Sequence, residues 1–445
     1  MGVASIEEAQ RLLERDGIHT VECAFPDSWG VLRGKRVPAS QFPRVAEKGF
    51  ALANACYVWD LSCEIFPIGF ANPDTGYPDM LAMPDLSTLR QLTWREGTAI
   101  VMCDTLDHGT HEPIALDPRH LLRTVIGRLQ RAGYEPIAAT ELEFYLCTED
   151  WQPVDDIIDC YSIPKGAQFE GVLSEIRRKM ESFGIIVEAC NMEYGPGQIE
   201  VNLGHGPALG IADDTCLFKY AVKEIARQHG VRATFMAKPF AVHSGNGMHA
   251  HLSLRDGSGA NAFDVRDLDD GGPLTSTLMQ RALAGLLAHQ VELTALNAPT
   301  INAYRRFADY SFAPTAVTWG LDNRQVAVRT LVDAGAATRI EARGGSADAN
   351  PPLVLAGLLA AVHDGLERRH PVPPMTAGDG YAPGAGEPLP ASLRESIHAL
   401  EHGTLLRGAL GDAFVDNFLD LLRHEVQAFA GQVTEWEKTR YIEVA

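Results

Sequence analysis

The sequence predicts an α+β protein of two domains, a small mixed domain followed by a larger one. Three observations support this prediction. At 445 residues the chain can bury more than one hydrophobic core. Up to about residue 110, short strand-like runs alternate with proline and glycine. From residue 118 a strong helical pattern begins, and the later strand-like segments carry charged residues at alternate positions.

In the first domain, residues 5–16 are expected to form an amphipathic helix with Ser5 as its N-cap. Strands are expected around residues 20–25 and 30–37, and the same texture continues to residue 110. A linker with the sequence HGTHEPIALDP follows. We therefore divide the chain into domains of residues 1–111 and 112–445.

In the second domain, apolar residues at positions 121, 122, 125 and 129 predict a helix that begins at Pro118. The proline- and glycine-rich stretches 255–273 and 371–390 are expected to be surface loops, because periodic segments resume on each side. Residues 392–430 are again helical in pattern.

Composition excludes several classes of partner. The formal net charge of −20 argues against nucleic acid or an anionic membrane surface, since either would require a basic patch. No apolar run approaches the roughly 20 residues of a spanning helix, and the N-terminus lacks the layout of a secretion signal. We therefore expect a cytoplasmic protein. The eight cysteines are scattered through the first half of the chain without paired close spacings, which favours reduced, structural thiols.

Residues 238–254, KPFAVHSGNGMHAHLSL, are interpreted as a strand entered through a glycine-containing loop. Alternation along the strand places His249, His251 and Ser253 on one face and apolar side chains on the other. The alternative is an edge strand with surface histidines. Three polar groups at period two beside a Ser-Gly-Asn-Gly turn favour a chemically active face.

Three further segments, ATELEFYLC, NMEYGPGQIEVNL and TRIEARGG, alternate charged and apolar residues in the same way. Taken singly, each glutamate is more often a solvated strand residue. Together, adjacent like charges need a cation, and five glutamates with one histidine could hold two Mg²⁺ or Mn²⁺ ions. Paired ions of this kind usually bridge phosphate oxygens, while neighbouring arginines bind phosphate or carboxylate. The set therefore favours phosphoryl transfer; it comprises Glu141, Glu143, Glu193, Glu200, His249 and Glu341.

From FPDSWGVLRGKRV near the start to VTEWEKTRY at the end, these motifs resemble those of the glutamine synthetase family. The resemblance implies one metal ion bound by Glu143, Glu193 and Glu200, and another bound by Glu141, His249 and Glu341. It implies that ATP contacts Glu188, His251, Ser253 and Arg339, with Arg324 and Arg329 on its phosphates. It implies glutamate binding by Gly245, His249, Arg306 and Arg343. Among these residues, the expected catalytic ones are Glu193, Arg324 and Arg306.

The same resemblance implies a β-grasp-like N-terminal domain and a large α/β catalytic domain with a curved antiparallel sheet. ATP would phosphorylate the γ-carboxylate of glutamate, and an amine would displace the phosphate, with two or three Mg²⁺ or Mn²⁺ ions per site. The sites would lie between neighbouring subunits of a homo-oligomer, either a hexameric ring or a dodecamer. The acyl phosphate must be kept from water, so a flap over the site is expected.

The sequence departs from ammonia-using relatives at two positions of the implied amine site. Phe312, in RRFADYSFAP, stands where those relatives carry a glutamate, and Leu52, in FALANACYVWD, stands near the position of an aspartate. Loss of both carboxylates leaves an apolar pocket, which we expect Tyr57 and Tyr310 to rim. The expected substrate is therefore a hydrophobic alkyl or aryl monoamine, and the product is a γ-glutamyl amide.

Alternative functions stay open from sequence alone. A polyamine or ethanolamine ligase fits if Asp309 or Asp60 binds the distal polar group, and an ordinary glutamine synthetase fits if a carboxylate is supplied from elsewhere. A guanidino kinase would not need the glutamate and histidine ligand sets, and a non-catalytic homologue would be expected to have lost them. Tyr381 lies where some bacterial relatives are adenylylated, but its neighbours differ, so its modification is not expected.

Overall fold

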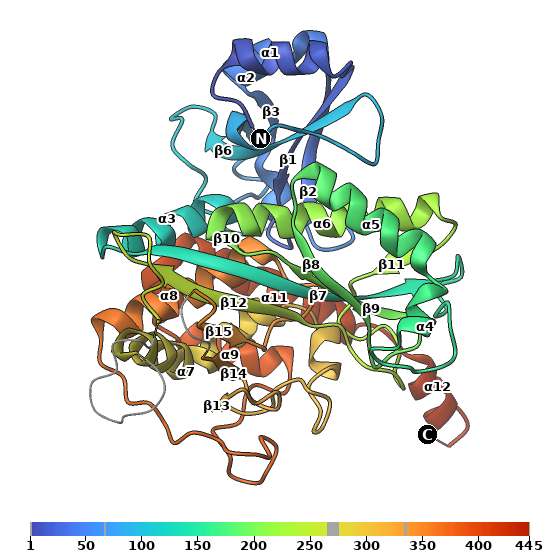
Figure 1. Cartoon of the computed structure of the whole chain (residues 1–445), viewed down its shortest axis with the longest axis vertical. Coiled ribbons are helices and arrows are strands. Elements are labelled where there is room, and N and C mark those ends of the chain that lie inside the picture. The colour runs from blue at the N-terminus through green and yellow to red at the C-terminus, as the bar shows by residue number, and fades with distance from the viewer. Residues whose placement is uncertain (1, 66–67, 265–275, 333–335, 445) are drawn as a thin grey trace.

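The computed structural model describes residues 2–65, 68–264, 276–332 and 336–444. Within these residues the backbone is organised around two β-sheets with helices packed against them (Figure 1). The N-terminal part holds a six-stranded sheet in the order β2-β1-β6-β4-β3, with β5 paired to β6. Its elements are α1 (Ile6–Arg15), β1 (Thr20–Pro26), β2 (Leu32–Pro38), η1 (Ala39–Gln41), α2 (Phe42–Lys48), β3 (Phe50–Ala53), η2 (Asn54–Tyr57), β4 (Asp79–Pro84), η3 (Leu86–Thr88), β5 (Arg90–Gln91) and β6 (Thr98–Asp107).

The predicted start of this region is confirmed. Ser5 caps α1, because its side chain accepts a hydrogen bond from the Glu8 backbone N–H at 3.2 Å. β2 begins at residue 32 rather than 30, because Asp27 Oδ1 accepts bonds from the backbone N–H groups of Trp29 and Val31, both at 2.9 Å. These bonds form a turn that delays the strand.

The larger part is built on a curled nine-stranded sheet in the described chain, in the order β13-β14-β15-β12-β7-β9-β8, with β10 and β11 paired to β7. Its pairs are antiparallel except β13 with β14. The strands are β7 (Glu135–Cys147), β8 (Val187–Met192), β9 (Gln198–Leu203), β10 (Gly206–Pro207), β11 (Arg232–Thr234), β12 (Met248–Arg255), β13 (Trp319–Leu321), β14 (Val328–Leu331) and β15 (Arg339–Ala342). The helices are α3 (Pro118–Arg131), α4 (Ile163–Ala167), α5 (Glu170–Phe183), α6 (Ala208–Gln228), α7 (Thr277–Asn297), η4 (Asn302–Arg305), α8 (Pro351–Glu367), α9 (Leu393–His402), α10 (Leu405–Leu410), α11 (Asp412–Ala430) and α12 (Glu435–Tyr441).

The alternating pattern on β7 separates a core face from a chemical face, as predicted. Leu142, Phe144 and Leu146 are fully buried. Phe144 packs against Phe218 of α6 at a ring-centroid distance of 6.5 Å and against Phe235 at 5.2 Å. Because successive side chains of a strand point to opposite faces, the glutamates at positions 141 and 143 lie on the face away from this core.

The predicted loops and C-terminal helical region are largely confirmed. Residues 371–390 form no helix, and their one backbone bridge joins Pro388 to Ala316 in the described chain. In the first loop, residues 256–264 lack regular structure, while 265–273 lie outside the described residues. The predicted helical region 392–430 is divided into α9, α10 and α11 by Gly403 and Gly411. Gly411 has φ of 90°, which favours glycine.

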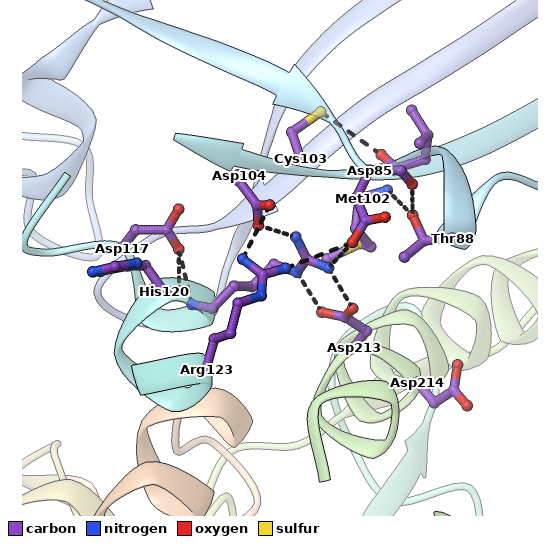
Figure 2. A network of polar contacts seen from close by, with 12 residues as sticks. Asp85, Thr88, Met102, Cys103, Asp104, Asp117, His120, Arg123, Asp213 and Asp214 are labelled. Carbon is purple, nitrogen blue, oxygen red and sulfur yellow. Dashed lines mark hydrogen bonds and ion pairs between the residues drawn. The ribbon is translucent and has the colours of Figure 1, made fainter. Parts of the chain in front are cut away.

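A buried arginine connects the two sheet regions. Arg119, on α3, is fully buried, and its guanidinium lies 2.9 Å from each carboxylate oxygen of Asp213 on α6. It also pairs with Asp85 at 3.0 Å and with Asp104, both from the N-terminal region. Figure 2 shows these carboxylates converging from separate elements, with Arg123 beside Asp104. We propose to keep the domain boundary between residues 111 and 112, in the connection that precedes α3.

Two further expectations concern the whole chain. All eight cysteines lie within the described residues and are free thiols. Among the described helices, none combines the length and the apolar character needed to cross a membrane.

Candidate active site

A band of glutamates and histidines crosses the large sheet on the face away from α6. The strand register produces this band, because Glu143 on β7 lies opposite Glu200 on β9, and Glu141 lies opposite His249 on β12. Next to β12, Glu341 on β15 lies opposite Arg329 on β14. Segments up to 200 residues apart in sequence therefore contribute to one surface.

Glu141 lies between the two histidines of β12. His251 Nε2 is 2.8 Å from one of its oxygens and His249 Nδ1 is 3.2 Å from the other. Burial alone would raise the pKa of Glu141, but the hydrogen bonds from His249 and His251 outweigh it and hold the pKa far below its usual range. Potential ligand atoms converge here in two overlapping triplets, Glu141–Glu200–His249 and Glu141–His251–Glu341, each within 4.8 Å.

Glu193 and Glu200 lie at the end of the band where carboxylates are crowded together. Burial, followed by repulsion from Glu143, raises the pKa of Glu193 to about 7. Burial and then repulsion from Glu141, Glu143 and Glu193 raise the pKa of Glu200 to about 9. Such crowded carboxylates bind protons when no metal ion balances them, and oxygen donors of this kind match Mg²⁺ and Mn²⁺. The residues therefore fit the predicted divalent ions.

Glu341 is held by two arginines. Arg329 Nη1 lies 2.8 Å from one of its oxygens, and Arg343 Nη1 pairs with the other. Burial opposes ionisation, but Arg343 and then His249 lower the pKa of Glu341 to about 2. The structure thus places a predicted phosphate-binding arginine and a predicted glutamate-binding arginine on the same predicted metal ligand.

A cavity of about 320 Å³ opens beside this band, between β7, β8, β9, β12 and the segment before β15. Four of the residues predicted to contact ATP line it: Glu188, His251, Ser253 and Arg339. Arg339 Nε donates a hydrogen bond to His251 Nδ1 at 3.2 Å, which connects the cavity to the Glu141 cluster. Arg329 lies deeper, at Glu341.

Arg306 lies beside the band, close to Gly247 and the Glu143 carboxylate. It is 5 % exposed and donates to the carbonyl oxygens of Arg343 at 3.3 Å and Gly344 at 3.4 Å. Burial lowers the pKa of Arg306, although the nearby charge of Glu143 acts in the opposite direction. Gly245 passes close by: a Cβ there would lie 2.6 Å from the Ala237 carbonyl oxygen and 2.8 Å from Arg306 Cγ. Such a site suits an incoming carboxylate.

An aromatic pair lies near Glu193, with Tyr194 52% exposed and Phe312 41% exposed. Phe312 stacks on Tyr194 with ring centroids 5.9 Å apart and an interplanar angle of 28°. The backbone N–H of Tyr194 donates to Glu193 Oε2 at 3.2 Å, so this stack adjoins the carboxylate. Arg343 Nη2 donates to the Phe312 carbonyl oxygen at 3.4 Å. Tyr310, predicted to rim the pocket, is 69 % exposed, and its hydroxyl lies 3.5 Å from Asp379 Oδ2.

Two aromatic residues were not anticipated from the sequence. Tyr194 follows Glu193 directly, which was an available signal, but its partner lies more than a hundred residues later. Tyr161 has a positive φ of 58° and is 61% exposed. Partial burial raises its pKa, and the charges of Glu193, Glu200 and Arg324 also act on it. The exposed Arg324 also acts electrostatically on Glu193, as expected for a residue near the reacting groups.

The prediction that Tyr57 rims the amine pocket is wrong. Its ring is fully buried in the N-terminal core, with its hydroxyl 2.8 Å from Thr105 Oγ1. Asp60 is also buried, at 8% exposed: its Oδ1 accepts bonds from the backbone N–H groups of Ser62 and Glu64, both at 2.8 Å, and its Oδ2 lies 3.5 Å from His424 Nε2. Leu52 lies on β3 in the N-terminal sheet, at the opposite end of the chain's fold from β13 and β14 (Figure 1). Within one chain, it is therefore separated from Phe312.

A curled, mostly antiparallel sheet that carries a band of glutamates and histidines is typical of a metal-dependent enzyme. Comparison with known sequences identifies the family. The family model for the glutamine synthetase catalytic domain matches residues 115–441. The chain belongs to the glutamine synthetase family, whose members are carbon–nitrogen ligases.

Individual relatives resemble the chain over nearly its whole length. A glutamate–isopropylamine ligase from a Pseudomonas species is 36% identical, with 99% of this chain and 98% of the relative covered. A γ-glutamylethanolamide synthetase from Streptomyces coelicolor is 37% identical over 98% of this chain and 96% of the relative. A solved GmaS–ADP complex superposes with a TM-score of 0.87 at 32% identity, covering 98% of this chain and 99% of that chain.

Proposed function

We propose that the chain is an ATP-dependent ligase that joins glutamate to a hydrophobic alkyl or aryl monoamine. The observation that carries this proposal is the Tyr194–Phe312 stack beside Glu193, where ammonia-using relatives are expected to have a carboxylate. An aromatic wall favours a nitrogen nucleophile with a hydrocarbon body over NH₄⁺. The similarity to ligases named for isopropylamine and ethanolamide supports the same substrate class.

We assign separate groups of residues to the nucleotide, the metal ions and glutamate. The cavity lined by Glu188, His251, Ser253 and Arg339 takes the nucleotide, and the similarity to a structure solved with ADP supports this assignment. Two or three Mg²⁺ or Mn²⁺ ions, when bound, neutralise charge on phosphate and carboxylate oxygens; Glu141, Glu143, Glu193, Glu200, His249 and Glu341 would hold them. Arg306, Arg343, His249 and the backbone at Gly245 hold and orient glutamate.

The reaction follows from this arrangement. A γ-carboxylate oxygen of glutamate attacks the γ-phosphorus of ATP, and the bond to the ADP oxygen breaks. The amine nitrogen then attacks the acyl carbon, loses a proton, and inorganic phosphate departs. Arg324 and Arg329 stabilise charge on the transferring phosphoryl group. The aromatic stack excludes water from the acyl phosphate, which would otherwise hydrolyse to glutamate.

A substrate panel tests the proposal. Purified protein with ATP, glutamate and Mg²⁺ is assayed for phosphate release with isopropylamine, aniline, ethanolamine, putrescine and ammonium. We expect the highest kcat/KM with isopropylamine or aniline. Ammonium turnover at an equal or higher kcat/KM would reject the monoamine assignment. Higher turnover of putrescine would favour the polyamine alternative, for which Asp309, or Asp379 beside the Tyr310 hydroxyl, could bind the distal ammonium.

The proposal extends to assembly and location. We propose a homo-oligomeric ring, hexameric or dodecameric, in which Leu52 of one subunit completes the amine site of its neighbour. This would explain why Leu52 and Phe312 are separated within one chain. The cytoplasm, where ATP and glutamate are available, is the proposed location.

A further inference from the structure

A second group of convergent metal-ligand side chains lies between α7 and α8, apart from the site described above. His289 projects from α7, Asp364 from the last turn of α8, and His370 from the segment just after α8. Their side chains are 15%, 11% and 23% exposed, respectively. One potential ligand atom from each lies within 4.8 Å of the others.

Both imidazoles are directed at the same oxygen. His289 Nε2 lies 2.9 Å from Asp364 Oδ2, and His370 Nε2 lies 2.6 Å from that atom. The two rings are 5.4 Å apart and nearly perpendicular, at 85°. The three potential ligand atoms therefore form one compact group centred on Asp364 Oδ2.

Arg368 holds the remaining oxygen of the aspartate. Its Nε lies 3.1 Å from Asp364 Oδ1, one turn along the same segment. A group that binds one carboxylate oxygen orients the other, which is the usual outer-shell arrangement around metal-binding carboxylates.

We propose that His289, Asp364 and His370 bind a divalent transition-metal ion of the zinc class, with water as the fourth ligand. Two imidazoles and one carboxylate suit Zn²⁺ and Co²⁺, whereas Mg²⁺ prefers all-oxygen surroundings. With bonds of about 2.0–2.1 Å, tetrahedral ligand atoms stand about 3.3 Å apart. The present separations of 2.9 and 2.6 Å need to widen by less than about 1 Å, which side-chain rotation provides.

The ion would link His370, at the start of the 371–390 loop, to His289 on α7, and so would hold that end of the loop in place. Further along that loop, Tyr381 donates to the Ala313 carbonyl oxygen at 3.1 Å, and the Gly380 N–H donates to Gln325 Oε1 at 3.1 Å. The loop therefore braces the segment that presents Phe312. Its two imidazoles distinguish this ligand set from the carboxylate-rich band.

Cobalt binding tests the proposal on the full chain. Metal-stripped protein is titrated with Co²⁺ in excess Mg²⁺, which occupies the oxygen-rich band, and the visible absorption of four-coordinate Co²⁺ is recorded. His289→Gln and His370→Gln are compared with His363→Gln, a matched change on α8 at a histidine that faces Glu367 instead. His398→Gln controls for the exposed histidine pair on α9.

We expect one four-coordinate Co²⁺ per chain in the native protein and in both control variants. His289→Gln and His370→Gln should bind it at least tenfold more weakly and lose the absorption. Circular dichroism in the presence of chelator establishes that these variants are folded; His370 lies outside the helices, so its replacement disturbs the fold least. Equal Co²⁺ spectra in all five proteins, or no Co²⁺ bound in excess Mg²⁺, would overturn the proposal and leave a hydrogen-bonded clamp.

Discussion

At residue 312, the aromatic ring is stacked on Tyr194 while the backbone adopts an unfavourable left-handed conformation. Phe312 and Tyr310 both have φ of 60°, a left-handed conformation that costs a non-glycine residue of order 1 kcal/mol or more. In return the Phe312 ring lies on Tyr194, at the residue that follows Glu193. Under the proposed function, this ring would contact the hydrocarbon body of the amine as it approaches.

The first prediction concerns this ring. Phe312→Glu should lower kcat/KM for isopropylamine by roughly 10- to 200-fold, because the isopropyl group loses its apolar contact with the ring. Turnover of ammonium should rise, because the new carboxylate attracts NH₄⁺. Phe312→Leu is the matched control and should keep the preference for the alkylamine. An unchanged ratio of the two kcat/KM values in Phe312→Glu would show that the stack does not select the amine.

A second prediction at residue scale concerns protons at the metal ligands. With pKa values of about 7 for Glu193 and about 9 for Glu200, the metal-free chain holds protons that a bound ion must displace. Affinity for Mg²⁺ should therefore fall as pH falls from 9 to 7, by about tenfold per unit for one displaced proton, and more steeply below 7. Calorimetry in two buffers of different ionisation enthalpy measures the proton release.

Glu200→Gln provides the control for this experiment. The amide keeps the size of the side chain and cannot release a proton, so proton release between pH 7 and 9 should largely disappear. Mg²⁺ affinity that stays flat from pH 7 to 9 in the native chain would contradict the raised pKa values.

At the scale of elements, strand periodicity predicted which charged side chains share a face of a strand, but not which strands lie side by side. The alternation in β7, β9, β12 and β15 identified which residues share a face, since a strand's side chains alternate strictly. It could not show that Arg329 and Arg343 both hold Glu341, because strand order and register depend on distant pairings. Tyr57 was misplaced for a related reason: a short 3₁₀ turn after β3 directs its ring into the core.

The loop before β12 supplies the third prediction. Gly245→Ala would place a Cβ 2.6 Å from the Ala237 carbonyl oxygen and against Arg306, so the loop and the guanidinium must shift. Overpacking of this kind costs about 1–3 kcal/mol, and we expect it to appear chiefly as a KM for glutamate raised about tenfold or more. Gly257→Ala, in a turn with no neighbouring atom within 4 Å, should leave KM unchanged. Equal KM values for glutamate in the two variants would show that Arg306 and the Gly245 loop do not bind glutamate.

At the scale of the molecule, the Arg119 network joins the two sheets, and the sequence offered no sign of it. Its partners come from β6, the turn after β4, and α6, so it exists only once the chain is folded (Figure 2). The fourth prediction is that Arg119→Met lowers stability by roughly 3–5 kcal/mol, because three carboxylates lose their buried counter-charge. Thermal denaturation should show a drop of several degrees. Arg123→Met, at a side chain 41% exposed that reaches the same Asp104, should change the midpoint little.

The last prediction follows from the separation of Leu52 and Phe312. If neighbouring subunits share each site, a chain with Leu52→Asp spoils the amine wall of its neighbour, whereas Glu193→Gln spoils the site on its own catalytic domain. Each variant alone should be almost inactive toward isopropylamine. Co-expressed in equal amounts and mixed at random in a ring, they should recover activity at about a quarter of the sites, where both contributions are intact. Mixing after separate assembly should recover none, and equally low activity in the co-expressed sample would place the whole site within one chain.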